Sequence, residues 1–523
     1  MTLSIPFSTV AVYTASGLVT YWLVTIGYYV FLHPLKNYPG PFLAKITDFY
    51  GGVHSMFLRL PQITQRDLNQ YGPVVRSGPN RLVFSSSKAL HDIYNNERVT
   101  KSDVYLVTLA TTGKICIFNA LDRQTHRTRR KLVGAAVTER AMRNFEPTMS
   151  SQIDIFLRLL MQASENNTHV NMSDNIRRLG ADIVGFLAFG FPLKAQTEDT
   201  YQFLVEATTF GNGISNVKMQ APVLSNSAIS LLTNLLTHTQ LRKFYNMLNL
   251  MISTRLSKPK DAYQDLYAHV VDQLEETKDV RMSDIWAEAM FFFPAGGDTV
   301  ATAMCSIFFY LSRNPDCYRK LADEIRSTFS SIGEIHGGPK LSGCRYLRAV
   351  IDESLRMSPP VSGTLWRKLY DDDDKSKPFL VDGHVVPPGT HVGVNIYSLH
   401  HNEEYFPDSY SFKPERWLEA DAETRRRMNE AFAAFSTGSR GCGGKAMAYL
   451  EASLVVAKTL WFFDFEKASG DAGKVGEGTP GVPHGRHRRE EFQIYDIFSS
   501  TQTGPNLTFH PREGSGWEGL RTT

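Results

Sequence analysis

The sequence predicts a mainly α-helical domain with small β-sheets, preceded by one N-terminal transmembrane helix. Three observations predict this fold class: an uncharged apolar run near the N-terminus, helical patterns that dominate from Ser87 to Met357, and β-type runs after Pro359 and Pro360. With 42% hydrophobic residues among 523, the chain can bury a sizeable core. Residues 42–523 are therefore expected to form one large domain.

The N-terminal run from Phe7 to Leu32 contains no Asp, Glu, Lys or Arg. As a helix, at about 1.5 Å per residue, it would be roughly 39 Å long, enough to cross a hydrocarbon core of about 30 Å. It lacks the basic start and small-residue exit of a cleavable signal peptide, so residues 1–32 are expected to be a signal anchor. Lys36 and Lys45 follow it, and the positive-inside rule then places the rest of the chain in the cytosol. A buried core helix is the alternative interpretation.

Residues 33–41 (HPLKNYPGP) are too rich in Pro and Gly to continue a helix, and they are expected to form a stiff hinge. The turn-rich segment from Tyr71 to Ser87 predicts a small sheet. The acidic run from Asp371 to Asp374, followed by Lys375, is expected to be a solvated loop tip.

One long helix is expected between Ser283, a suitable N-cap, and Asn314, where the following proline stops it. It is apolar nearly all round, which indicates that it runs through the core. Pro294 should remove the hydrogen bond to Met290 and kink the helix there.

The C-terminal third is expected to be mostly β-type and irregular. Strands are predicted between Phe379 and Val392, and helix is expected to return only from Gly444 to Phe462. Residues 469–491 form a Gly- and charge-rich loop, and residues 494–510 predict a closing hairpin. Four histidines without metal-ligand spacing are interpreted as surface residues: His400, His401, His484 and His487.

Charge and cysteine content exclude several classes of protein. The 56 basic and 53 acidic residues nearly balance, so the overall charge of the protein gives no indication that it binds nucleic acid. The five cysteines are odd in number and scattered, which disfavours a disulfide framework or a zinc ribbon and favours a reducing compartment.

The segment from Phe435 to Gly444 (FSTGSRGCGG) contains the most informative cysteine, Cys442. Its glycines let backbone N–H groups approach a thiolate closely, and Arg440 suits an anionic cofactor edge. A helix is predicted to begin just after Cys442, and its positive end also favours a thiolate.

Two other interpretations of this loop fail on context. Residues 441–446 match G-x-G-x-x-A, but no strand precedes them and no βαβ unit surrounds them, so a dinucleotide site is excluded. A phosphate-binding loop would need glycine at position 439 and Ser or Thr at position 446, where Ser439 and Ala446 stand.

The pattern F-x-x-G-x-R-x-C-x-G over residues 435–444 resembles the haem-binding signature of the cytochrome P-450 superfamily. Three further motifs occur in that family's order. Residues 295–299 (AGGDT) resemble its oxygen-activation motif, and residues 353–356 (ESLR) with 414–417 (PERW) are similar to its E-x-x-R and PERW pair. The two glycines in the first motif cost about 1 kcal/mol each relative to alanine, so they indicate space or helix–helix close packing.

The resemblance implies a set of site residues. Cys442 would be the axial iron ligand, Asp298 and Thr299 the catalytic pair, and Glu353, Arg356 and Arg416 a buried structural network. The remaining cofactor-binding positions are Phe435, Gly438, Arg440 and Gly444 in the loop, with His126, Arg130 and, by a weaker match, Arg367 beside the haem propionates. The other basic residues of that helix, Arg127, Arg129 and Lys131, would face an acidic reductase.

The resemblance also implies a function. It predicts the cytochrome P-450 fold, haem b, and a monooxygenase that receives electrons from NADPH through cytochrome P-450 reductase, with cytochrome b5 as a second donor. The hinge and layout resemble the fungal microsomal branch, which implies an endoplasmic reticulum membrane and a hydrophobic small molecule of secondary metabolism. A haem-thiolate isomerase or dehydratase and a non-enzymatic haem sensor or electron carrier are the alternatives. By family analogy the substrate pocket would be shaped by residues 101–120, 201–227, 287–294, 361–365 and 499–503.

Overall fold

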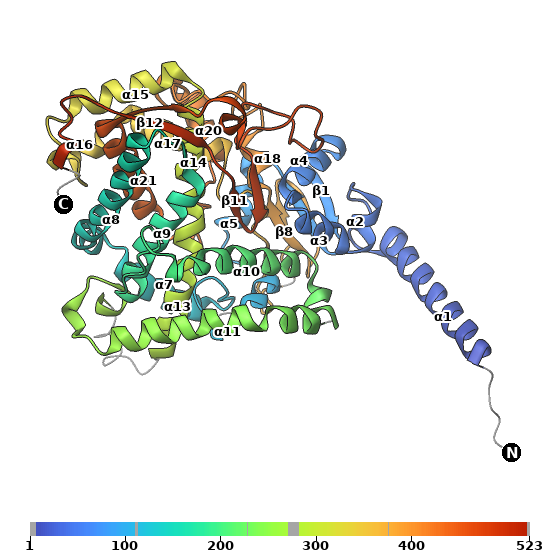
Figure 1. Ribbon diagram of the computed structural model, residues 1–523. Helices are drawn as coiled ribbons and strands as arrows, with labels where there is room; N and C mark the ends of the chain where they lie inside the picture. The colour runs from blue at the N-terminus through green and yellow to red at the C-terminus, as the bar shows by residue number, and fades with distance from the viewer. Residues whose placement is uncertain (1–6, 110–112, 227, 270–281, 375, 520–523) are drawn as a thin grey trace.

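A computed structural model describes residues 7–109, 113–226, 228–269, 282–374 and 376–519. Residues 1–6 of the predicted anchor, Lys375 of the charged run, and the last four residues lie outside the described part. The described chain forms a mostly helical body that includes small sheets, and helix α1 (Phe7–Gly27) extends away from that body (Figure 1). The predicted fold class of helices with small sheets is confirmed.

Helices make up most of the body. The longer ones are α4 (Leu60–Tyr71), α7 (Arg123–Ala136), α8 (Glu139–Glu165), α9 (Met172–Phe189), α10 (Phe203–Gln220), α11 (Ala228–Leu256), α13 (Met282–Phe292), α14 (Thr299–Leu311), α15 (Pro315–Thr328), α17 (Arg345–Met357) and α21 (Lys445–Phe462). The shorter ones are α2 (Phe42–Ile46), α3 (Phe49–Met56), α5 (Ser87–Tyr94), α16 (Pro339–Ser342), α18 (Ile396–His400), α19 (Arg416–Glu419) and α20 (Ala422–Ala431).

Four small sheets complete the described fold. The largest has the strand order β1-β2-β8-β5-β3, made by β1 (Val74–Gly78), β2 (Arg81–Phe84), β8 (His391–Val394), β5 (Arg367–Leu369) and β3 (Val99–Lys101). A second has the order β4-β12-β9, made by β4 (Val170–Asn171), β12 (Asn506–Pro511) and β9 (Phe463–Lys467). Two hairpins are formed by β6 (Phe379–Val381) with β7 (His384–Val386), and by β10 (Ile494–Ile497) with β11 (Ser499–Gln502). The sheet expected near Tyr71 to Ser87 is confirmed, and distant strands enlarge it.

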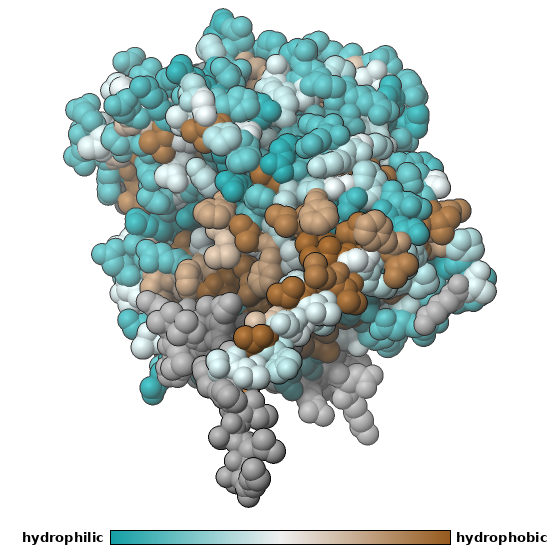
Figure 2. Space-filling view, turned by 90° about the vertical axis from the view of Figure 1, so that its right-hand side faces the viewer, coloured by the Kyte–Doolittle hydropathy of each residue, from teal (hydrophilic) through white to brown (hydrophobic). Residues whose placement is uncertain are grey.

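The N-terminal apolar segment is helical, as predicted. Among the described residues two helical stretches are long and apolar enough to cross a membrane, 8–32 and 282–311. None of the first is buried in the protein, whereas 67% of the second is. Around the point where α1 leaves the body, α2, α3 and the residue after α3 expose Phe42, Leu43, Met56 and Phe57. Figure 2, which views this side of the molecule, shows hydrophobic side chains gathered across it.

The segment 33–41 lies against β1 of the large sheet. The Arg76 amide donates to the Pro39 carbonyl at 2.8 Å, and the Arg76 guanidinium donates to the Tyr29 carbonyl at 2.9 Å. Leu35 is fully buried. The chain therefore leaves the apolar helix along a fixed path.

The long core helix runs from Met282 to Leu311, close to the predicted bounds, but its middle is not α-helical. Residues Phe293–Asp298 form a π-helical segment, η6, between α13 and α14. The missing N–H of Pro294 falls in this segment, where a wider turn tolerates the lost hydrogen bond. α14 is buried along nearly its whole length.

The C-terminal third differs from expectation in three ways. Helices α18, α19 and α20 lie between Ile396 and Ala431, so the prediction that helix returns only at Gly444 is wrong. His400 and His401 are buried, so their interpretation as surface residues is also wrong. Residues 494–502 form the expected hairpin, but β12 pairs with β9 and β4 instead of extending it. The run 371–374 is a surface turn, as predicted.

Candidate functional site

The loop before α21 is folded tightly around Cys442. The Cys442 amide donates to the Phe435 carbonyl at 2.9 Å, and the Gly441 amide donates to the Gly438 carbonyl at 3.0 Å. Gly438 has a φ of +75°, and a Cβ there would lie 2.0 Å from the Tyr94 carbonyl oxygen. Only glycine fits this position, which explains one of the fixed residues of the motif.

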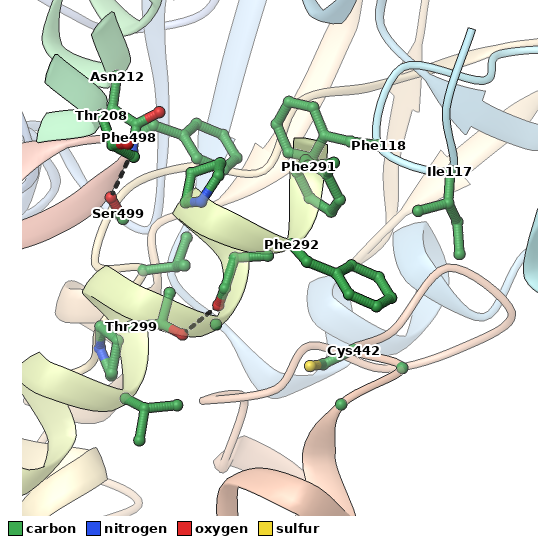
Figure 3. Close-up of a pocket in the computed structure, with 18 of the residues that line it drawn as sticks. Ile117, Phe118, Thr208, Asn212, Phe291, Phe292, Thr299, Cys442, Phe498 and Ser499 are labelled. Atoms are coloured by element: carbon green, nitrogen blue, oxygen red, sulfur yellow. Dashed lines mark hydrogen bonds between the residues drawn. The ribbon is translucent and has the colours of Figure 1, made fainter. Parts of the chain in front are cut away.

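The sulfur of Cys442 points into a large cavity opposite the Thr299 turn of the core helix (Figure 3). Burial raises the pKa of this thiol, while the Gly444 amide and the nearby Arg130 and Lys445 charges act to lower it. A cysteine in this environment ionises when a metal ion takes the proton's place, because the coordinated form is the thiolate.

The cavity has a volume of about 1120 Å³. That exceeds the roughly 300–1,000 Å³ of an ordinary small-molecule pocket, so it has room for a flat cofactor and an organic molecule together. Its walls come from the core helix, α10, residues 101–108 and 116–118, and the Cys442 loop. Aromatic side chains dominate the side away from Cys442, with Phe118 stacked on Phe291 at a ring separation of 4.9 Å. Of the expected pocket-forming ranges, residues 110–112 and 227 lie outside the described part of the chain.

Five basic side chains gather at one edge of the cavity: Lys101, His126, Arg130, Arg367 and Arg440. Several are held by backbone carbonyls. Arg130 donates to the Gly441 carbonyl at 2.6 Å, and Arg440 donates to the carbonyls of Ala120 at 2.5 Å and Leu121 at 2.8 Å. Within the described residues none of the five forms an ion pair with a carboxylate.

The electrostatics of this cluster favour an anionic ligand. Burial and the neighbouring cations, Arg440 first, lower the pKa of His126 to about 3, and burial with Arg367 and Arg440 holds the pKa of Lys101 well below its usual value. Carboxylates placed here would offset this mutual repulsion and receive charge-assisted hydrogen bonds. At Gly444 a Cβ would meet nothing within 4 Å, so the backbone after Cys442 faces open space. The donor set therefore fits a flat cofactor with an axial thiolate and acidic substituents at one edge.

Thr299 and Asp298 lie on different sides of the core helix. Thr299 lines the cavity, and its hydroxyl donates to the Ala295 carbonyl at 2.6 Å (Figure 3). The buried Asp298 carboxylate accepts from the Asn212 amide at 3.0 Å and lies 3.5 Å from the Ser499 hydroxyl, behind that wall. Burial raises the pKa of Asp298 to about 6.

One of the two glycines of the motif, Gly296, has a packing role. A Cβ on Gly296 would lie 2.9 Å from the Val184 side chain, and a Cβ on Gly180 would lie 3.4 Å from the Gly297 backbone. The close approach of α9 to the core helix thus supports the packing interpretation for Gly296, whereas a Cβ on Gly297 would meet nothing within 4 Å. Gly296 also lines the cavity, so the small residue leaves space on that side as well.

Comparison with known proteins agrees with this geometry. A family model described as Cytochrome P450 matches residues 55–483. The chain belongs to the cytochrome P450 family. It is 31% identical to the cytochrome P450 monooxygenase AKT7 of Alternaria alternata over 95% of this chain and 96% of that protein. The cytochrome P450 monooxygenase poxM of Penicillium oxalicum is also 31% identical, over 94% of this chain and 92% of its own length. Apf7 of Gibberella fujikuroi, another such monooxygenase, is 31% identical over 93% and 95%.

The protein is therefore a cytochrome P450 monooxygenase, an oxidoreductase of a family that binds haem through a cysteine thiolate. In this P450 the structure brings together Glu353, Arg356 and Arg416, as the resemblance implies. The fully buried Glu353 carboxylate accepts from Arg356 Nε at 2.9 Å and from Arg416 Nε at 3.0 Å. It also accepts from Trp417 Nε1 and the Lys413 amide, each at 3.0 Å. The Arg356 and Arg416 charges hold the pKa of Glu353 below its usual value, although burial acts to raise it.

One basic residue of α7 lies elsewhere than expected. Arg129 points inward to Asp284, at 2.9 Å, so its interpretation as a reductase-facing residue is wrong. Arg127 and Lys131 are exposed.

Sequence reasoning missed Glu288, the second acidic residue near Arg129. The buried Glu288 carboxylate accepts from the Ile117 amide at 2.9 and 3.0 Å, and burial raises its pKa to about 8. It thereby fixes the segment that carries Ile117 and Phe118 over the P450 cavity. Its only signal in the sequence was a second acidic residue, after Asp284, in a mostly apolar helix.

Proposed function

We propose that this P450 inserts one oxygen atom of O2 into a hydrophobic small molecule, with Cys442 as the iron ligand. Electrons would come from NADPH through a reductase, and the substrate would belong to fungal secondary metabolism. The observation that carries the proposal is the thiol of Cys442 facing an apolar cavity of about 1120 Å³ with a basic cluster at its edge. The relatives named above are all fungal monooxygenases, which supports the same reaction class.

The residues present would hold haem b in three ways. Cys442 would bind the iron, the basic side chains of His126, Arg130, Arg367 and Arg440 would bind the propionates, and Gly444 would leave room for the ring. When bound, haem activates O2 at an iron made electron-rich by the thiolate. The aromatic wall around Phe118 and Phe291 would bind the substrate and exclude water.

Thr299 on the cavity side of the core helix and Asp298 behind it would together deliver protons to the cavity. The Thr299 hydroxyl donates to Ala295, so its oxygen can accept a hydrogen bond from a group in the cavity. A carboxyl group with a pKa of about 6, such as Asp298, can take up and release a proton near neutral pH. Its partners Asn212 and Ser499 would connect it toward α10 and β11.

Electron supply and location complete the proposal. The exposed Arg127 and Lys131 offer positive charge to an acidic reductase or cytochrome b5. The exposed apolar helix α1 would anchor residues 1–32 in the endoplasmic reticulum membrane as a single pass, with residues 33–41 as hinge and residues 42–523 as a cytosolic catalytic domain. An isomerase or a haem sensor would not couple NADPH consumption to substrate oxidation.

The test of the iron ligand is Cys442→Ala in the full-length protein. The reduced carbon monoxide complex of the wild type should show the red-shifted Soret band of a thiolate-ligated haem, and the variant should lose it. Cys317→Ala is the matched control, because Cys317 is a buried cysteine on α15 away from the cavity. An unchanged band in Cys442→Ala would overturn the assignment.

A further inference from the structure

A second, smaller cavity lies beside the main one. It has a volume of about 30 Å³, above the roughly 10–15 Å³ that one water molecule needs. We call it the polar chamber. The polar residues that define it are Ser77, Asn216, Gln220, Asn395 and Asp496.

Asn395 presents a free donor to this chamber. Its side-chain oxygen accepts from the Ser398 amide at 2.7 Å and so caps α18, but its Nδ2 has no hydrogen-bond partner among the described residues. Asn395 is only 1% exposed, so bulk water does not reach this donor. A buried, unsatisfied N–H is costly, which indicates that the chamber receives a hydrogen-bonding group.

Asp496 offers the complementary acceptor. Its carboxylate accepts from Asn216 Nδ2 at 2.9 Å and from the Phe498 amide at 3.1 Å, and a carboxylate has capacity for further donors. The other charged groups that line the chamber are already paired. Arg81 donates to the Gln220 and Met219 carbonyls at 3.0 Å and lies 3.4 Å from Asp48, and Asp67 binds Arg66 at 2.7 Å.

Three apolar side chains separate the chamber from the main cavity, because Val361, Leu365 and Phe498 line both. Phe498 is the unusual one: its φ of +82° is in the left-handed region that non-glycine residues rarely adopt. Its ring packs edge-on against Phe118 at 5.1 Å, inside the main cavity (Figure 3). Its amide binds Asp496, so the same residue contacts both spaces.

We propose that the polar chamber binds a hydroxyl group at one end of an otherwise apolar substrate, which enters when the Phe498 ring turns aside. Asn395 and Asp496 line the same space of only about 30 Å³, so one hydroxyl in it could donate to Asp496 and accept from Asn395. A carboxylate would be repelled by Asp496, and an ammonium group could not accept from Asn395. The inference rests on the proposed monooxygenase function and narrows its substrate to hydrophobic alcohols.

The experiment compares matched pairs of compounds with and without one hydroxyl: dodecan-1-ol with dodecane, and farnesol with farnesene. Binding to the full-length, haem-loaded protein in nanodiscs is followed by the shift of the Soret band. We expect at least one alcohol to bind about tenfold more tightly than its partner, equivalent to about 1.4 kcal/mol. Asn395→Ser keeps a good N-cap but removes the amide donor. It should therefore bring the ratio of the two dissociation constants, hydrocarbon to alcohol, close to one. Asp496→Asn, which keeps the shape of the side chain but removes its charge, should lower this ratio too.

Asn171→Ser is the matched control, because Asn171 also caps a helix, α9, and lines neither cavity. It should keep the wild-type ratio. Equal ratios in the wild type and Asn395→Ser, or no preference for either alcohol, would overturn the inference and leave the chamber as a water site. Loss of the red-shifted carbon monoxide band in the wild type would instead overturn the proposed function, so the two failures are distinguishable.

Discussion

A single glycine sets the shape of the cysteine loop. Gly438 combines a left-handed backbone with a contact that no side chain tolerates, since a Cβ would lie 2.0 Å from the Tyr94 carbonyl oxygen. Gly389 has nearly the same conformation, with a φ of +79°, but a Cβ there meets nothing within 4 Å. Comparing substitutions at Gly438 and Gly389 therefore separates the cost of a left-handed backbone from the cost of the overlap with Tyr94.

We therefore expect Gly389→Ala to lower the free energy of unfolding by about 1–2 kcal/mol, the cost of placing an L-residue in a left-handed conformation. Gly438→Ala should cost more than that and should also release haem, because the loop must move away from Tyr94. Denaturant unfolding and the haem-to-protein ratio measure the two effects. Equal losses in both variants, with full haem content, would show that the Tyr94 contact is unimportant.

Thr299 allows a test of proton delivery by one hydroxyl. Thr299→Ala should keep the carbon monoxide spectrum and NADPH consumption, because the haem-binding residues are untouched. With any substrate that the wild type oxidises, hydrogen peroxide should then be released at the expense of product. Thr299→Ser, which retains the hydroxyl, should restore most of the yield. The measurement is product and peroxide formed per NADPH, and an unchanged yield in Thr299→Ala would leave Thr299 as a packing residue.

Residues that belong to a local sequence motif could be predicted, whereas residues whose role depends on contacts with distant parts of the chain could not. His400 is buried because its ring stacks on Phe432 at 5.4 Å and its Nε2 accepts from the Ala433 amide at 2.9 Å. Glu288 accepts from the amide of Ile117, which lies 171 positions away along the chain. Neither contact can be predicted from the spacing of residues within one segment.

At the scale of elements, the Glu353 network joins α17, α19 and the segment between α18 and α19. Arg356 is fully buried, and it also donates to the carbonyls of His400 at 2.9 Å and Ser409 at 2.7 Å. Among the described residues both guanidiniums pair with Glu353 alone, so removing its charge would leave Arg356 and Arg416 without a paired carboxylate. Breaking such a pair costs far more than the pair contributes relative to an apolar substitute.

We expect Glu353→Gln to lower the free energy of unfolding by about 3–5 kcal/mol. Glu423→Gln is the matched control, because its carboxylate forms an exposed ion pair with Arg426 at 2.7 Å, and its loss should barely change the free energy of unfolding. Urea unfolding monitored by circular dichroism gives both values. A loss below 1 kcal/mol for Glu353→Gln would show that the network is not structural.

Elements with a strong periodic or apolar signal were predictable, and short ones were not. The core helix was found within a few residues of its ends because its apolar surface continues all round. α18 and α19 have five and four residues, too few for a periodic pattern, and tertiary contacts hold them. The π-helical turn at Pro294 was predicted only as a kink, because a proline signals a lost hydrogen bond and not the way the helix accommodates it.

The catalytic body is predicted to lie on the cytosolic side of a membrane that receives α1. None of α1 is buried against the body over its described residues, and α2 and α3 expose large apolar side chains beside it. A membrane that receives α1 would lie close to this face (Figure 2). The basic residues after the anchor, Lys36 and Lys45, favour a cytosolic body.

The N-glycosylation sequons report this orientation. Three occur, at Asn166, Asn171 and Asn506. Asn166 is the informative one because it is exposed after α8, whereas the other two are half-buried where β4 pairs with β12. With a cytosolic body none of them can be glycosylated, since the modifying enzyme acts in the lumen.

We therefore expect no mass shift on endoglycosidase treatment of the full-length protein expressed in a fungal host. An N-terminal extension carrying an Asn-x-Thr sequon is the positive control, because it should enter the lumen and become glycosylated. An endoglycosidase-sensitive shift in the protein without the extension, abolished by Asn166→Gln, would place the body in the lumen. That result would contradict electron supply from a cytosolic reductase, while leaving the iron ligand and the polar chamber to their own tests.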